Sequence, residues 1–362
     1  MMAVKPEPTC RGELRLDEPM ARHTSWRVGG PARYFYRPAD LEDLGRYLSC
    51  TATARPVLWL GLGSNLLVRD GGFSGTVIFT FGGLQEMEWV DAVTLRAGAG
   101  VTCSRIARRS SERGMGGAEF LAGIPGTLGG ALAMNAGAFG GETWRLVSCV
   151  ETMDIQGVHR VRTPDEYRIA YRSVEGPDHE WFVAAHLRLQ PVDAESAREN
   201  IRQLLEKRGR NQPTGQASCG SVFRNPPGDH AARLIETAGL KGALIGGAQV
   251  SEKHANFIIN TGTATAADIE SLIYRVQEQV AQVHGVTLET EVRIVGEPAY
   301  GSDSGCCSGG WCLHERDGWI RQGGGPDGRA VCGKGDIVAQ RGGRIAIPRA
   351  SGHSRRRRGH RR

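Results

Sequence analysis

Two glycine-rich segments constrain the fold of this 362-residue chain more than any other feature. The first, GLGSN at 61–65, directly follows the apolar run RPVLWL. The second, GIPGTLGGALAMNAGAFGG at 123–141, has seven glycines in nineteen positions. Glycine allows tight turns, and it allows backbone N–H groups to approach a pyrophosphate that a side chain would keep away. Closely packed turns would explain one such segment, whereas two in the same region favour a nucleotide cofactor.

The pattern around the glycines indicates an α+β domain. Neither segment has the G-x-G-x-x-G spacing followed by a helix and an acidic residue about twenty positions later, so a Rossmann dinucleotide fold is not supported. Runs rich in β-branched and aromatic residues predict strands at 75–81, 92–101 and 180–189. Helices are expected at 39–51 and 102–114, the second with Thr102 as N-cap and Gly114 as its stop.

A second, smaller α+β unit follows the first. The segment 193–213 reads as a helix that Pro213 ends, and apolar residues recur at helical spacing within 265–285. A further helix is expected at 228–242, and residues 286–296 alternate as a strand. The expected organisation is an N-terminal extension at 1–19, a first domain at 20–192, a second domain at 193–298 and a tail at 299–362.

The tail carries the basic character of the chain. It has thirteen Lys or Arg against five Asp or Glu, so the net charge of +6 for the whole chain becomes −2 without it. It contains fifteen of the 51 glycines and no sustained periodicity, which predicts a disordered Gly/Arg-rich segment. The arginines leave a nucleic-acid-binding arm open, but the lack of interleaved aromatic residues disfavours nucleic acid as a partner. Translation from a shifted reading frame is a third interpretation.

The sequence shows neither a membrane-spanning segment nor a metal-binding pattern. No run of eighteen apolar residues predicts a transmembrane helix, and the first twenty residues contain acids and prolines where a signal peptide is apolar. We therefore expect a cytoplasmic protein without a membrane partner. Its cysteines lack metal-ligand spacing and read as reduced thiols, and those of the tail form no recognisable zinc pattern with His314. No metal is expected.

Three polar residues are candidates for chemistry, and each has a simpler interpretation. Arg172, in AYRSV, is either a surface cation or a guanidinium that holds a carboxylate through two parallel hydrogen bonds. Glu291, in LETEVRIV, is either solvated or, if its face lines a cleft, an acid or electrostatic partner. Ser221, in SCGSVFRNP, lacks the closing glycine of G-x-S-x-G, so a nucleophile elbow is unsupported and a turn is the simpler interpretation.

Seven motifs taken in order resemble the UDP-N-acetylenolpyruvoylglucosamine reductase (MurB) family, in its shorter-chain branch. They span about residues 20–298 and read HTSWRVGGPA, GLGSNLLV, AGIPGTLGGALAMNAGAFG, YRSV, CGSVFRNP, KHANFIIN and LETEVRIVGE. The resemblance implies an α+β fold, with an FAD-binding module of the vanillyl-alcohol-oxidase (PCMH) type followed by a smaller α+β substrate-binding domain. The tail after Pro298 departs from the family pattern.

The resemblance also implies the cofactor, the substrate and the reaction. FAD would be the cofactor, NADPH the reductant, and a small-molecule UDP-sugar, UDP-N-acetylglucosamine enolpyruvate, the substrate. Reduced FAD would pass hydride to C3 of the enolpyruvyl group, and protonation at C2 would give UDP-N-acetylmuramate for peptidoglycan synthesis. The implied cofactor-binding residues belong to both glycine segments and are Gly61, Gly63, Ser64, Asn65, Gly123, Ile124, Pro125, Gly126, Thr127, Gly129 and Gly130.

By the same resemblance, each polar candidate takes a role. Arg172 would polarise the substrate carboxylate, Glu291 would be its carboxyl counterpart, and Ser221 would be the general acid that protonates C2. The implied contacts to the UDP portion are Arg224, Asn225, Lys253 and His254. Two alternatives stay open at this point. One is another FAD-dependent oxidoreductase of the same fold. The other is a non-catalytic flavin- or nucleotide-binding regulator with a nucleic-acid-binding tail.

Overall fold

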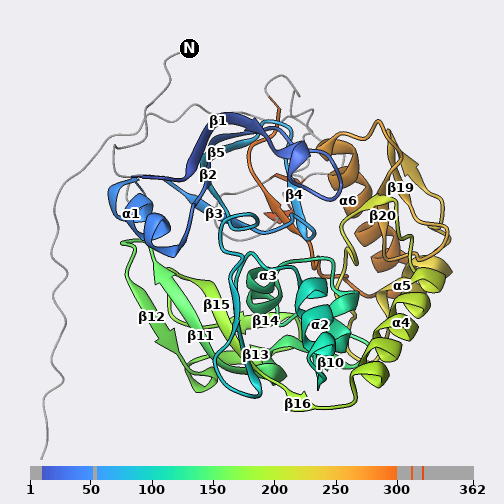
Figure 1. Ribbon diagram of the computed structural model, residues 1–362. Coiled ribbons are helices and arrows are strands. Elements are labelled where there is room, and N and C mark those ends of the chain that lie inside the picture. The colour runs from blue at the N-terminus through green and yellow to red at the C-terminus, as the bar shows by residue number, and fades with distance from the viewer. Residues whose placement is uncertain (1–9, 52–54, 300–310, 313–319, 322–362) are drawn as a thin grey trace, which may run out of the picture. The chain divides into compact units, whose positions relative to one another are not determined.

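The computed structural model describes residues 10–51, 55–299, 311–312 and 320–321 (Figure 1). Contacts group the chain into one unit of residues 1–302 and another of residues 303–362. In the second unit, the described residues form one antiparallel pair, β22 (Trp311–Cys312) and β23 (Ile320–Arg321). Most of the predicted tail at 299–362, including His314, therefore lies outside the described residues, as do residues 1–9 of the predicted extension.

The first unit begins with a four-stranded sheet in the order β1-β2-β5-β3. β1 (Glu13–Pro19) is antiparallel to β2 (Pro31–Arg37), whereas β5 (Phe73–Phe79) is parallel to both β2 and β3 (Val57–Leu60). α1 (Leu41–Thr51) packs its buried leucines, Leu44 and Leu48, into the core of this layer. They are four residues apart and so lie on one helix face, which confirms the predicted helix. β1 lies within the segment predicted as an extension.

The second sheet is antiparallel and has the order β12-β11-β15-β7-β6. Its strands are β6 (Met87–Trp89), β7 (Thr94–Gly98), β11 (Val147–Asp154), β12 (His159–Arg162) and β15 (Glu180–Arg188). Its core also contains buried residues of α2 (Cys103–Glu112) and α3 (Leu128–Ala133). The Thr102 hydroxyl accepts a hydrogen bond from the Arg105 N–H, and Gly114 has a left-handed φ of 72°, so both predicted ends of the α2 helix are confirmed.

Short elements connect these layers. They are β8 (Met115–Gly116) paired with β16 (Gln190–Pro191), β9 (Gly137–Ala138) with β10 (Gly141–Glu142), β13 (Arg168–Ala170) with β14 (Ser173–Glu175), and the 3-10 helices at Met20–Arg22, Glu119–Gly123, Thr143–Leu146 and Pro164–Glu166. The β13–β14 hairpin has the two-residue tip Tyr171–Arg172. This hairpin is important for the site described below.

The C-terminal part of the unit is a small sheet with three helices. Its strands, in the order β17-β20-β19-β18, are β17 (Ala217–Ser218), β18 (Leu244–Ile245), β19 (Ala248–Val250) and β20 (Ile258–Asn260). The helices are α4 (Ala194–Asn211), α5 (Ala231–Thr237) and α6 (Ala266–His284). α6 buries residues at the predicted helical spacing, namely Ile269, Leu272, Ile273, Val276 and Val280, whereas Val283 in its last turn is exposed.

The chain then returns to the first part of the unit. β21 (Arg293–Val295) pairs in parallel with β4 (Leu66–Val68), immediately after the GLGSN segment. The strand predicted at 286–296 is therefore formed only over its last part, because the residues before it make a single bridge, between Thr290 and Phe223. The carboxylate of Asp70 accepts N–H bonds of 2.9 Å from Ala266 and Ala267, so the start of α6 is also attached next to β4.

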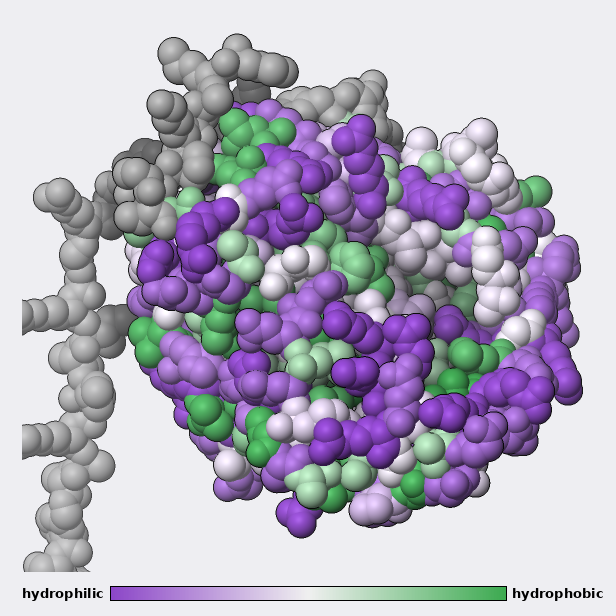
Figure 2. Space-filling view, in the orientation of Figure 1, coloured by the Kyte–Doolittle hydropathy of each residue, from purple (hydrophilic) through white to green (hydrophobic). Residues whose placement is uncertain are grey.

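The exposed face visible in Figure 2 carries hydrophilic and hydrophobic residues side by side. Such mixing is usual, because apolar atoms make up more than half of the accessible surface of folded proteins. None of the described helices is long and apolar enough to cross a bilayer. No broad apolar area is visible on this face.

Candidate active site

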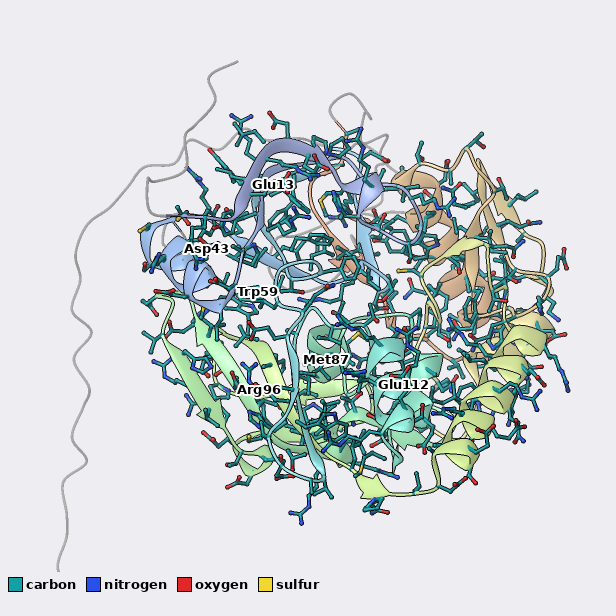
Figure 3. The ribbon with its side chains drawn as sticks, viewed as in Figure 1. Glu13, Asp43, Trp59, Met87, Arg96 and Glu112 are labelled. Carbon is teal, nitrogen blue, oxygen red and sulfur yellow. The ribbon has the colours of Figure 1, made fainter. Side chains whose placement is uncertain are left out.

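One cavity of about 860 Å³ brings the two glycine segments together. All eleven residues predicted to bind the cofactor line it, and so do the three predicted catalytic residues. In Figure 3, Trp59 of β3 lies between the two sheets, and its ring stacks on Trp181 of β15 with centroids 5.3 Å apart. Both tryptophans line the cavity, so it lies where the two sheets meet.

The GLGSN loop offers free donors to this cavity. Among the described residues, none accepts a hydrogen bond from the backbone N–H groups of residues 61–65. The carbonyls of the same loop are used, since that of Gly63 accepts from Ser25 N–H and that of Asn65 from Arg293 N–H, both at 3.1 Å. Successive free amides form a concave surface that suits an anion such as a diphosphate.

Glycine is required in these loops for two different reasons. A Cβ on Gly61 would collide with the hydroxyl of Thr127, so the two glycine segments touch each other there. A Cβ on Gly130 would meet nothing closer than Thr127 Oγ1 at 4.0 Å, although Gly130 lines the cavity. The first glycine is therefore needed for packing, whereas the second leaves room for a ligand. This cradle fits a large planar cofactor with a diphosphate.

Arg172 reaches the cavity from the tip of the β13–β14 hairpin. Its Nε lies 3.1 Å from Oε1 of Glu291, and its Nη2 donates to the carbonyl of Gly137 at 2.9 Å. The side chains of Arg172 and Glu291 are 19 % and 14 % exposed. Among the described residues, Arg172 Nε has no aligned hydrogen-bond acceptor, so the contact with Glu291 is an ion pair.

Glu291 lies between two motifs that are distant in sequence. Its N–H donates to the carbonyl of Val222 at 2.8 Å, and its carbonyl accepts from Asn65 Nδ2 at 2.9 Å. Burial raises the pKa of the Glu291 carboxyl, and the nearby charges of Arg172 and Arg224 oppose that rise only in part. Alternation in a strand at 286–296 would put Glu289 and Glu291 on the same face. Glu289 is 77 % exposed, however, so the two carboxyls lie in different environments.

Ser221 follows Gly220, whose φ of 72° is left-handed, and it lines the same cavity. The next residues are held by Asn256, which bonds Val222 N–H and Phe223 N–H at 2.9 Å. Among the described residues, none bonds to the Ser221 hydroxyl. The preceding Cys219 is buried, which raises the pKa of its thiol to about 12, so it is a packed neighbour and not a reactive thiolate.

The four residues predicted to contact UDP do not line the cavity. Arg224 Nη2 donates to the carbonyl of Arg172 at 3.2 Å, and Asn225 Oδ1 accepts from Ala231 N–H at 3.1 Å at the start of α5. Lys253 Nζ donates to a carbonyl near the end of α4, and His254 is packed on Phe257. Their contacts with UDP stay a prediction.

Sequence reasoning missed a cation in the cavity wall. Arg208, in the last turn of α4, is half-buried there, and burial lowers the pKa of its guanidinium. Among the described residues, its side chain bonds only Gln212 Oε1, at 3.1 Å, and no carboxylate lies within ion-pair distance. Nothing in the sequence distinguishes Arg208 from the other arginines of α4; only packing shows that it lines the cavity.

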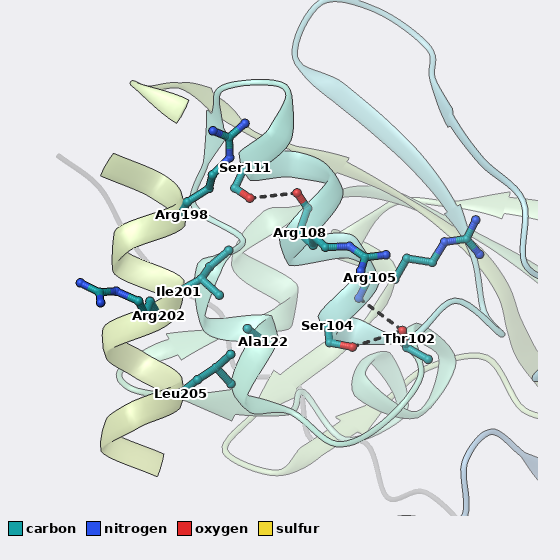
Figure 4. Close-up of a pocket in the computed structure, with 10 residues that line it drawn as sticks. All are labelled: Thr102, Ser104, Arg105, Arg108, Ser111, Ala122, Arg198, Ile201, Arg202 and Leu205. Carbon is teal, nitrogen blue, oxygen red and sulfur yellow. Dashed lines mark hydrogen bonds between the residues drawn. The ribbon is translucent and has the colours of Figure 1, made fainter. Parts of the chain in front are cut away.

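A second hollow, of about 620 Å³, lies between α2 and α4 (Figure 4). Three of its arginines, Arg108, Arg198 and Arg202, pair with glutamates three or four residues away on their own helices. No predicted site residue lines this hollow. No group of three or more His, Cys, Asp or Glu side chains within the described ranges could hold a metal ion.

Comparisons with known proteins identify the family. The model of an FAD binding domain matches residues 32–161, and that of the UDP-N-acetylenolpyruvoylglucosamine reductase C-terminal domain matches residues 212–295. A UDP-N-acetylenolpyruvoylglucosamine reductase of Alkalilimnicola ehrlichii is 62% identical over 286 residues, which cover 79% of this chain and 96% of the relative. The chain belongs to the UDP-N-acetylenolpyruvoylglucosamine reductase family.

Further relatives agree with this assignment. The reductase of Methylococcus capsulatus is 60% identical over 79% of this chain and 94% of its own length. The crystal structure of the family member from Thermus caldophilus matches with a TM-score of 0.68 and 35% identity, covering 78% of this chain and 98% of the other. Family membership confirms the predicted α+β fold with its PCMH-type module, the FAD cofactor and the assignment as an FAD-dependent oxidoreductase.

Proposed function

We propose that this chain reduces UDP-N-acetylglucosamine enolpyruvate to UDP-N-acetylmuramate, with NADPH as reductant, for peptidoglycan precursor synthesis in the cytoplasm. The observation that carries the proposal is one cavity lined by Arg172, Ser221 and Glu291 together with both glycine segments. When bound, FAD would supply the redox chemistry, taking two electrons from NADPH and delivering hydride to C3 of the enolpyruvyl group.

The glycine segments would hold the cofactor. The free amides of residues 61–65 suit its diphosphate, and the open backbone surface at Gly130 leaves room for a planar ring. Trp59 and Trp181 add an apolar wall to the same cavity, from which water is displaced when a ligand binds.

Arg172 and Glu291 would stabilise the charge that develops on the substrate. Hydride addition at C3 leaves an electron pair at C2, which is delocalised into the adjacent carboxylate as an enolate. A guanidinium stabilises such an oxyanion most strongly where water is excluded, and Arg172 is mostly buried. Glu291 holds the guanidinium in place as a carboxylate, and because its pKa is raised, it loses this charge at a higher pH than an ordinary glutamate does.

Ser221 would donate the proton that completes the reaction at C2. Its hydroxyl is available, because no described residue already bonds to it. A serine hydroxyl is a weak acid in water, so this role depends on a positive charge that stabilises the alkoxide, and Arg172 lines the same cavity. Proton transfer from a positioned group typically contributes about 10²–10⁴-fold in rate.

Arg208 would bind a phosphate of NADPH or of the UDP portion. A half-buried guanidinium without a carboxylate partner is satisfied best by an anionic ligand, and phosphate can accept two parallel N–H bonds from it. This supports a phosphate-bearing ligand in the cavity, either NADPH or a UDP-sugar.

The test is an assay of the purified holoenzyme. The visible spectrum should show bound flavin, and NADPH consumption should depend on the UDP-enolpyruvyl sugar. UDP-N-acetylglucosamine, which lacks the enolpyruvyl group, is the matched control and should support no consumption beyond background. A protein that cannot take up FAD, or NADPH consumption that is equal with both sugars, would contradict the proposal.

A further inference from the structure

The backbone of Arg172 is held in an unusual conformation. Its φ is 54°, in the left-handed region that non-glycine residues seldom adopt, and it forms half of the two-residue hairpin tip. Such a conformation is strained for a non-glycine residue and persists only where the surroundings impose it. The direction of the guanidinium depends on this backbone, so the contacts that impose the conformation also aim the side chain.

Two residues from other parts of the chain hold the hairpin tip. Arg224 Nη2 donates to the carbonyl of Arg172, and Asn135 Nδ2 donates to the carbonyl of Ala170, both at 3.2 Å. Asn135 is only 2 % exposed, and its own carbonyl accepts from Arg172 Nη1 at 3.4 Å. The tip is therefore held on both sides, by the second glycine segment and by the loop that follows Ser221.

Arg224 is poorly placed for the UDP contact that the family resemblance implies. It does not line the cavity, and its Nη2 donates instead to the carbonyl of Arg172 at the hairpin tip. The carboxylate nearest to it, Glu289, is 3.7 Å away and largely exposed, so this ion pair adds little. Its charge still acts on Glu291, because it helps to lower the pKa of that buried carboxyl.

We infer that Arg224 is a positioning residue, which holds the Tyr171–Arg172 tip so that the Arg172 guanidinium meets Glu291 at the cavity. The inference rests on the proposed function, in which Arg172 stabilises the enolate. In this role Arg224 orients the guanidinium of Arg172 and does not bind the UDP portion of the substrate.

The kinetic test separates these two roles. The holoenzyme is reduced with NADPH and then reoxidised by the UDP-enolpyruvyl sugar at a series of concentrations, for wild type, Arg224→Met and Arg224→Lys. A displacement of a reacting group by about 1 Å can lower a rate by about 10²-fold. We expect Arg224→Met to lower the limiting rate about 10- to 100-fold, with a half-saturating substrate concentration within about twofold of wild type. Arg224→Lys, which keeps one donor and the charge, should recover part of the rate.

Two outcomes would overturn the inference. A higher half-saturating substrate concentration at an unchanged limiting rate would show that Arg224 contacts the UDP portion. No change in either quantity would show that Arg224 does not position the catalytic cation.

A second measurement needs no turnover. Amide hydrogen exchange of the hairpin at 165–178 should be faster in Arg224→Met than in wild type, while β11 (Val147–Asp154) exchanges as before. Unchanged exchange in the hairpin would overturn the inference. If the wild-type enzyme is not reoxidised by this substrate, the proposed function fails, but the exchange data still decide whether Arg224 holds the tip.

Discussion

Nε of Arg172 lies 3.1 Å from Oε1 of Glu291, although more than a hundred residues separate the two in sequence. Arg172 Nε has no aligned acceptor among the described residues, so the two groups form an ion pair whose strength depends mainly on distance. Such a pair tolerates a small shift of the guanidinium towards a third group. A substrate carboxylate in the cavity could therefore engage Arg172 while Glu291 still restrains it.

Ser221→Ala should separate the two halves of the reaction. Reduction of the flavin by NADPH needs no proton from Ser221 and should stay near wild type. Reoxidation by substrate should fall about 10²–10⁴-fold, because the proton donor at C2 is lost. Stopped-flow absorbance of the flavin measures both steps. Ser218→Ala, in the same segment but outside the cavity wall, is the control. Reoxidation within a few-fold of wild type would show that Ser221 is not the donor.

Glu291→Gln should remove the charge that restrains Arg172 while keeping the side-chain shape. We expect reoxidation to fall roughly 10- to 100-fold. In wild type, the ionised fraction of Glu291 decreases as the pH drops through a pKa above the ordinary value of 4.5. The rate should therefore fall at a higher pH than an ordinary glutamate would produce, and Glu291→Gln should lose that limb of the pH profile. The exposed neighbour serves as control: Glu289→Gln should leave rate and profile unchanged. An identical limb in wild type and Glu291→Gln would assign it to another group.

Gly130→Ala should weaken FAD binding without harming the fold. The added methyl group would meet no protein atom closer than 4.0 Å, but it would project where the cofactor is expected. The apoprotein should melt at the wild-type temperature or slightly above, since alanine favours the helix α3. The dissociation constant for FAD, from fluorescence titration, should rise at least about tenfold, the equivalent of 1.4 kcal/mol.

Gly61→Ala is the matched control. It should instead lower the melting temperature of the apoprotein, because its methyl group collides with Thr127. FAD binding unchanged by Gly130→Ala would exclude contact at that position.

Arg208→Met should weaken binding of the phosphate-bearing ligand. A hydrogen bond to a charged group contributes about 1.5–3 kcal/mol, so the half-saturating concentration of NADPH or of the sugar should rise about 10- to 100-fold. The flavin content should not change. Arg210→Met, at an exposed position of the same helix, is the control. If neither NADPH nor the UDP-sugar binds more weakly to Arg208→Met, Arg208 does not bind a phosphate of either ligand.

Glu151 should make the fold sensitive to acid. Burial would raise the pKa of this carboxyl, but hydrogen bonds from Arg96, His186 and His159 outweigh burial and lower it to about 2. Because the folded-state pKa lies below the unfolded value of about 4.5, the stabilisation is present above pH 4.5 and is lost as the pH falls towards 2. It amounts to about 3 kcal/mol at neutral pH.

Thermal unfolding from pH 7 to pH 3 provides the measurement. Glu151→Gln should melt below wild type at pH 7, and the difference should shrink as the pH drops below 4.5. Glu86→Gln removes an exposed partner of Arg96 and should change little. A difference in melting temperature that is constant across this range would contradict the assignment.

Local features were predictable from sequence. The α6 helix follows from an apolar residue every three or four positions and from the Thr265 cap, because both act within one helical turn. The glycine segments predicted a cofactor loop for an equally local reason, since a missing Cβ acts on its own backbone. The strand predicted at 286–296 was too long, because strand formation needs a partner, and only Arg293–Val295 finds one in β4.

The tertiary structure decided how the polar residues are used. Pattern alone left Arg172, Ser221 and Glu291 as surface or turn residues, and the family resemblance suggested their roles without their contacts. Pairing of β21 with β4 brings Glu291 beside the first glycine segment, and the hairpin tip brings Arg172 to meet it. Packing also exposed Glu289, put Arg208 into the cavity wall and turned Arg224 towards the hairpin. The sequence by itself thus determined which backbones can form helices, turns and a cradle. Which charges meet depends on contacts between residues far apart in the chain, and no local pattern encodes those.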